Sequence, residues 1–65
     1  MKVVHLKLAQ KMTSCGMTQK DLAARMYMTK SAINRRMTGS VDWGVSEIKL
    51  LCKIFDSTFE ELFGE

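Results

Sequence analysis

Four polar side chains in the stretch 30–35 are the best candidates for binding a partner. Lys30 and Asn34 are four residues apart, and Ser31 and Arg35 repeat that spacing one position later. On an α-helix this spacing places all four on one outward face. Lysine can donate hydrogen bonds to guanine O6 and N7, and asparagine can pair with adenine N6 and N7. The pattern is typical of a helix that enters the DNA major groove.

The sequence does not suggest catalysis. His5 is the single histidine, it stands near the N-terminus, and it fits a surface residue better than a base or a ligand. Glu60 and Glu61 are adjacent, so they diverge on a helix and cannot share a substrate. Cys15 and Cys52 lack the spacing of a metal site; we expect buried or half-buried free thiols, with one disulfide as the alternative. We expect no enzyme, no catalytic residue, no metal and no cofactor.

Apolar residues recur at helical spacing along the whole chain, which predicts an all-α fold. There is no proline and no internal repeat, and no stretch alternates with period two. A chain of 65 residues makes one domain, 1–65, with an adequate but thin core. Cap and stop signals predict a compact bundle of five helices. The first is expected over Lys2–Ser14, with Val4, Leu8 and Met12 on its buried side.

Caps and glycines bound the next two helices. Gly16 suits the left-handed residue that ends the first helix. Thr18 and Asp21 form a capping box for the second helix, and Thr29 caps the third, which stops at Gly39. Tyr27 and Met28 should form the turn between them. The side chains expected to fill the space between these two helices are Leu22, Ala23, Met26, Met28 and Ile33.

A fourth helix should follow the loop over residues 40–45. Ser46 is the expected cap of this helix, and Trp43 should cover the bundle from the loop. The apolar residues of the fourth helix follow the cleanest amphipathic spacing in the chain. They are Ile48, Leu51, Cys52 and Phe55.

A last short helix should begin at the T-x-x-E capping box formed by Thr58 and Glu61. It presents Phe59, Leu62 and Phe63 before Gly64. Core positions are the expectation for Phe59 and Leu62.

Charge is divided unevenly along the chain. Residues 1–40 hold eight basic and one acidic side chain, a net +7, whereas residues 41–65 hold two basic and six acidic, a net −4. A polyanion would be attracted to the first part and repelled by the second. There is no apolar run of about 18 residues that could span a membrane, and we expect no secretory signal. We expect double-stranded DNA as the partner, no membrane, and a cytoplasmic location.

Several of these residues together resemble the phage lambda repressor and Cro-like (XRE-type) helix-turn-helix family. The resemblance covers about Leu8 to Phe63, with the helix-turn-helix itself at about 18–39. The positions that carry it most strongly are Met17-Thr18-Gln19, Leu22-Ala23, Ser31, Ile33, Gly39, Ser46-Glu47-Ile48 and Glu60-Glu61-Leu62. The resemblance implies a five-helix bundle whose third helix enters the major groove.

The resemblance also implies roles for individual side chains. Base edges should be read by Lys30, Ser31, Asn34 and Arg35. Gln19 opens the second helix, where its side chain and the nearby N–H groups can hold a phosphate. The full set of phosphate candidates is Thr18, Gln19, Thr29, Arg36, Thr38 and Ser40; such contacts fix register without reading sequence.

Two positions depart from the family pattern. Tyr27 stands where the turn usually has glycine, so either the turn differs or the tyrosine accepts a left-handed conformation that costs about 1–2 kcal/mol. Arg36 stands where an apolar residue usually seals the third helix. Met37 should take over that sealing, which would leave Arg36 partly exposed and near a phosphate.

The function expected from these observations is a small phage or prophage repressor of the Cro type. It should bind a pseudo-palindromic operator as a homodimer, because one module contacts few base pairs. Candidate dimer residues are Trp43 and Phe63, and no small-molecule ligand is expected. Two alternatives stay open: an antitoxin-like or adaptor module that binds a protein through its acidic tail, and a controller of a restriction-modification or mobile-element locus. As a DNA-binding repressor, the protein would lie in the bacterial cytoplasm in association with the nucleoid.

Overall fold

The structure, a computed structural model, describes residues 5–64 and consists of five α-helices in that range. The predicted all-α five-helix bundle is confirmed. The helices in chain order are α1 (Leu6–Ser14), α2 (Gln19–Arg25), α3 (Lys30–Met37), α4 (Val45–Phe55) and α5 (Phe59–Phe63).

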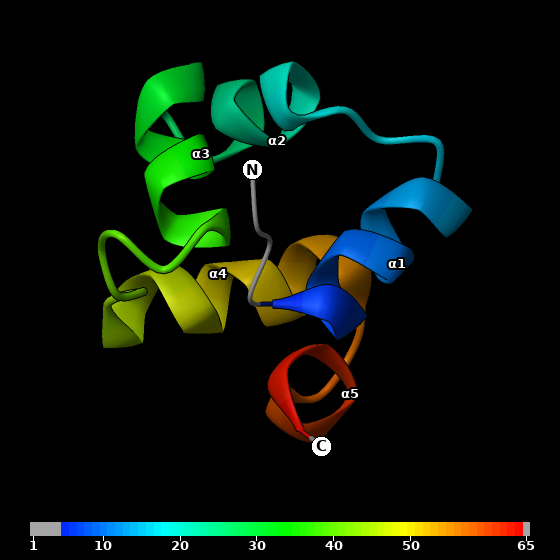
Figure 1. Ribbon diagram of the computed structural model, residues 1–65. Helices are drawn as coiled ribbons and strands as arrows, with labels where there is room; N and C mark the ends of the chain where they lie inside the picture. Colours follow the sequence, from blue (N-terminus) through cyan, green and yellow to red (C-terminus); the bar gives the residue numbers. More distant parts are fainter. Residues whose placement is uncertain (1–4, 65) are drawn as a thin grey trace.

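Helix α4 crosses the middle of the molecule (Figure 1). Helices α2 and α3 pack against each other on one side of α4, and α5 lies on the other side, where it contacts α1 and α4. The Cα atoms extend over 24 × 24 × 22 Å. Within residues 5–64, no helix combines the length and the apolar character needed to cross a membrane.

Each helix contributes one completely buried aliphatic side chain to a single core. Burying one such side chain stabilises the fold by about 1.5–3 kcal/mol relative to leaving it exposed. Around them pack the buried Met12, Ala23 and Met37. The five central residues are Leu8, Leu22, Ile33, Leu51 and Leu62.

Two capping boxes begin helices as predicted. The Thr18 hydroxyl accepts the Asp21 N–H at 3.1 Å, and the Thr18 N–H donates to the Asp21 carboxylate at 3.0 Å. Thr58 and Glu61 repeat this exchange at 3.2 and 3.0 Å. Thr29 caps α3 by accepting the Ala32 N–H at 3.1 Å. Local sequence alone therefore fixes where α2, α3 and α5 begin.

The predicted starts of two other helices are corrected. Helix α1 begins at Leu6, not Lys2, and the predicted contact of Val4 lies outside the described residues. The cap of α4 is Gly44 and not Ser46, because the Gly44 N–H donates to the Glu47 carboxylate at 2.8 Å. A glutamate at the third helical position can thus select the start of a helix without a capping hydroxyl.

Three burial predictions are also wrong. The thiol of Cys15 is exposed, whereas Cys52 is half-buried as expected, and both are free. Phe59 is 53% exposed, because α5 turns only Leu62 fully into the core. His5 is half-buried and lies edge-on to the Phe63 ring, with 5.3 Å between centroids.

The turn between α2 and α3 is strained at Tyr27, which has φ 57°. The Met28 N–H bonds the Ala23 carbonyl at 2.9 Å and the Tyr27 N–H bonds the Ala24 carbonyl at 3.4 Å. This Schellman pattern requires a left-handed residue at its centre. The same pattern after α1 uses Gly16, with φ 67°. Of the two alternatives, Tyr27 therefore accepts the strain, and its side chain is 94% exposed.

Replacing Tyr27 by glycine should stabilise the protein. The change removes left-handed strain of about 1–2 kcal/mol and adds a backbone entropy cost of about 0.5–1 kcal/mol. The free energy of unfolding from urea titration should rise by up to about 1.5 kcal/mol, the difference between these two terms. Tyr27→Ala keeps the Cβ atom and serves as the control, with no such rise. Equal effects of the two variants on the free energy of unfolding would contradict backbone strain at Tyr27.

The unfolding free energy should fall in acid. The Thr18 N–H lowers the pKa of Asp21, and the Thr58 N–H lowers the pKa of Glu61. A carboxyl group whose pKa is lower in the folded than in the unfolded state stabilises the folded state. This stabilisation is complete above the unfolded pKa values of 3.8 for Asp21 and 4.5 for Glu61. It is lost as the pH falls through the lower pKa values of the folded state. Urea titrations at neutral pH and below pH 4 should show this fall, and D21N/E61Q should reduce it. If the unfolding free energy of D21N/E61Q falls in acid as much as that of the wild type, groups other than Asp21 and Glu61 cause the fall.

Candidate nucleic-acid interface

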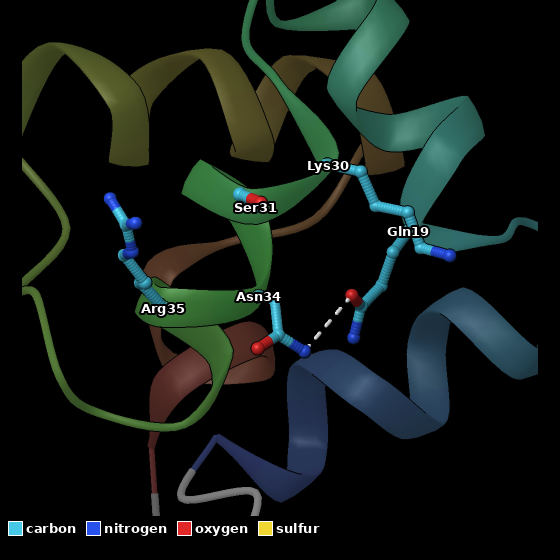
Figure 2. A pocket seen from close by; sticks show the side chains of 5 residues that line it. All are labelled: Gln19, Lys30, Ser31, Asn34 and Arg35. Carbon is cyan, nitrogen blue, oxygen red and sulfur yellow. Dashed lines mark hydrogen bonds between the residues drawn. The ribbon is translucent and has the colours of Figure 1, made fainter.

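An open hollow of about 300 Å³ lies on the outer side of α2 and α3. Figure 2 shows Arg35 on one side of it and Lys30 and Gln19 on the other, with Ser31 and Asn34 between them. The structure thus gathers the four predicted base-reading residues and Gln19 in one place. The hollow holds two cationic and three neutral polar side chains and no acidic one. Its chemistry suits an anionic ligand that also offers hydrogen-bonding edges.

Asn34 is oriented by a neighbouring helix. Its Nδ2 donates to Gln19 Oε1 over 3.4 Å, a long hydrogen bond that links α3 to the first residue of α2 (Figure 2). This leaves Asn34 Oδ1 and the second Nδ2 hydrogen available. One acceptor and one donor side by side match the N6 and N7 atoms of adenine.

The threonines among the phosphate candidates are used for capping and local bonds. The Thr18 hydroxyl accepts the Asp21 N–H and donates to the Asp21 carboxylate at 2.9 Å. The Thr38 hydroxyl donates to the Asn34 carbonyl at 3.1 Å, and its oxygen lies 3.4 Å from the Ser40 hydroxyl. The hydroxyl hydrogen of Thr29, by contrast, has no partner within residues 5–64. Among these threonines, Thr29 has the most capacity left for a phosphate.

Arg36 does not join the hollow. Its guanidinium forms a two-point ion pair with Glu47 of α4, with Nε–Oε1 3.0 Å and Nη2–Oε2 3.2 Å. Nη1 donates to the Ala32 carbonyl at 3.0 Å. Three of the five guanidinium N–H groups are thus bonded within the chain, and the phosphate contact of Arg36 stays a prediction. Met37 is buried in its place, as predicted.

Glu47 is the residue that sequence reasoning missed. Its carboxylate accepts the Arg36 guanidinium and the Gly44 N–H, and these bonds, led by that of Arg36, lower its pKa. The spacing from Gly44 to Glu47 was a usable signal for a capping interaction.

The two dimer candidates lie on a separate face. Trp43 is 9% exposed and belongs to the core, so its predicted covering role is confirmed and it offers little surface to a second chain. Phe63 is half-buried and stacks on the exposed Phe59 ring, with 5.3 Å between centroids. A hollow of about 260 Å³ opens there. Phe59 therefore exceeds both predicted residues in exposed apolar surface.

Comparison with known proteins identifies a family-wide pattern in this chain. A protein-family model described as helix-turn-helix matches residues 8–62. No curated protein and no solved structure matches the chain significantly. Within the described range, no three His, Cys, Asp or Glu residues are grouped to hold a metal. The matched range contains all five residues of the hollow and the turn between α2 and α3.

Proposed function

We infer the role of this chain from its family: it belongs to the XRE-type helix-turn-helix proteins, the family of the phage lambda repressor and Cro. The resemblance inferred from the residues is thereby confirmed. The match supports a DNA-binding domain of a transcriptional regulator. The operator, the oligomeric state and the biological setting are proposals.

We propose that α3 enters the major groove and reads bases through the hollow. The observation that carries this is the gathering of Lys30, Ser31, Asn34 and Arg35 with Gln19 on one uncovered face. Lys30 would donate to guanine O6 and N7, and Asn34 would pair with adenine. Gln19 and Thr29 stand at the starts of α2 and α3, where backbone N–H groups favour a phosphate. Phosphates would fix the register and α3 would select the sequence.

Two copies would bind one operator. The longest extent of one copy is 24 Å, which is less than the spacing of about 34–36 Å between half-sites one helical turn apart. The exposed Phe59 and the half-buried Phe63 supply an apolar surface for a two-fold contact that leaves the hollow uncovered. A dimer on a pseudo-palindromic site would block the polymerase. The chain would then act as a Cro-like phage or prophage repressor at the bacterial nucleoid.

Duplexes selected from a random library should be palindromic, and their binding should weaken steeply with salt. Each phosphate contact adds about −0.9 to the slope of log K against log salt, so six contacts cost about a thousandfold between 50 and 200 mM. Fluorescence anisotropy at several salt concentrations measures the slope. Absence of binding to any duplex would refute the proposal. Enrichment of single half-sites would refute the dimer alone.

Truncation of a base-reading side chain should relax the sequence preference. Lys30→Ala or Asn34→Ala should cost about 1–3 kcal/mol on the selected operator and much less on random duplex. Lys49→Ala is the matched control for Lys30, because Lys49 is an exposed lysine on α4 outside the hollow. Competition titrations against single-base variants give the preference. An unchanged preference in both variants would place the reading face elsewhere.

A further inference from the structure

The polar link between α3 and α4 has a geometry that the DNA-reading face does not explain. We propose that Arg36 and Glu47 are positioning residues that determine sequence specificity: their ion pair sets the angle at which α3 presents Lys30 and the other residues of the hollow to the bases, without contacting DNA. The inference rests on the proposed function of α3. It assigns a role to a residue pair that the family match leaves without one.

The ion pair constrains direction as well as distance. Two parallel bonds, Nε–Oε1 at 3.0 Å and Nη2–Oε2 at 3.2 Å, hold the planar guanidinium of Arg36 against the planar carboxylate of Glu47. A third bond from Nη1 ties the same group to the Ala32 carbonyl of α3. A bidentate pair of this kind has a defined mutual orientation, which a single ammonium group cannot reproduce.

The carboxylate that receives Arg36 is itself held in place. Glu47 Oε1 accepts the Gly44 N–H at 2.8 Å at the start of α4. The Arg36 guanidinium carbon lies 6.0 Å from the centroid of the Trp43 ring, which is buried. The pair therefore connects α3 to a fixed helix terminus and to a core residue.

Arg36 lies on the side of α3 opposite to the hollow, where its ion pair can control the tilt of the helix. It follows Asn34 by two residues, a rotation of about 200° around the helix, so it projects away from the hollow. Lys30 lies six residues away, about 9 Å along the axis, so a tilt of about 10° would move it by about 1.5 Å. That displacement is larger than the range of about 0.5 Å over which N–H···O distances vary.

Loss of the pair should leave the fold intact. Ile33 and Met37 hold α3 to the core through completely or almost completely buried side chains. The Arg36 and Glu47 side chains keep 17% and 26% of their surface exposed, so water can solvate a charge that loses its partner. The apolar contacts keep α3 attached, and the ion pair restricts its tilt.

Variants that keep the charge but change the geometry test the proposal. Glu47→Asp shortens the carboxylate arm, and Arg36→Lys removes the two-point contact. Glu60→Asp is the matched control, because Glu60 is an exposed glutamate on α5 with no side-chain hydrogen bond within residues 5–64. The readout is the ratio of affinities for the selected operator and for its single-base variants. Circular dichroism verifies folding, and either variant suffices if the other does not fold.

In the wild type, a single wrong base pair should lower the affinity on the order of tenfold. In both test variants this factor should fall to about twofold, whereas Glu60→Asp should keep the wild-type factor. Binding to random duplex should keep its affinity and its salt slope. Unchanged discrimination in folded E47D or R36K would overturn the proposal.

A further variant separates positioning from direct DNA contact. Arg36→Met should also reduce discrimination while the salt slope stays as in the wild type. A slope smaller by about 1 with discrimination intact would make Arg36 a phosphate contact and overturn the proposal. Failure of the wild-type chain to bind any duplex would overturn the proposed function as well, whereas wild-type binding with unchanged E47D discrimination would overturn only this inference.

Discussion

The fold depends on five aliphatic side chains, one from each helix, that meet where no solvent reaches them. The helices are 5–11 residues long, and isolated helices shorter than about 12–15 residues are marginal in water. None of them is therefore expected to persist without its buried residue. Because Leu22 and Ile33 both belong to this cluster, the relative position of α2 and α3 is a consequence of the whole core and not of their turn alone.

The same helix serves the core and the surface through opposite sides. Ile33 and Met37 of α3 are buried, while the residues of the hollow are exposed or half-buried. An apolar contact resists separation but is non-directional, so it leaves some freedom of roll and tilt. The ion pair to α4 supplies the missing directional constraint. This division explains how α3 can carry an arginine on its inner side, since Met37 already provides the burial.

The features that were predicted correctly are those that depend on residues close together in the chain. The boxes of Thr18 and Thr58 and the left-handed Gly16 depend on partners within five residues, and each was predicted correctly. The features that were missed or predicted wrongly depend on distant packing. The partner of Arg36 lies eleven residues away on another helix, and the exposure of Phe59 depends on how α5 packs against α1 and α4. Periodicity identifies the polar face of α3, but its angle to the rest of the molecule is a property of tertiary contacts.

Trp43 gives the molecule an intrinsic optical probe. It is the single tryptophan of the chain, and its indole nitrogen is buried without a hydrogen-bond partner among residues 5–64. An indole in such dry surroundings emits at shorter wavelength than one in water. The ring lies beside the Arg36 guanidinium and contacts Phe63 edge-on. The emission wavelength of Trp43 thus reports, without any label, on both the Arg36–Glu47 ion pair that holds α3 and the aromatic residues of α5.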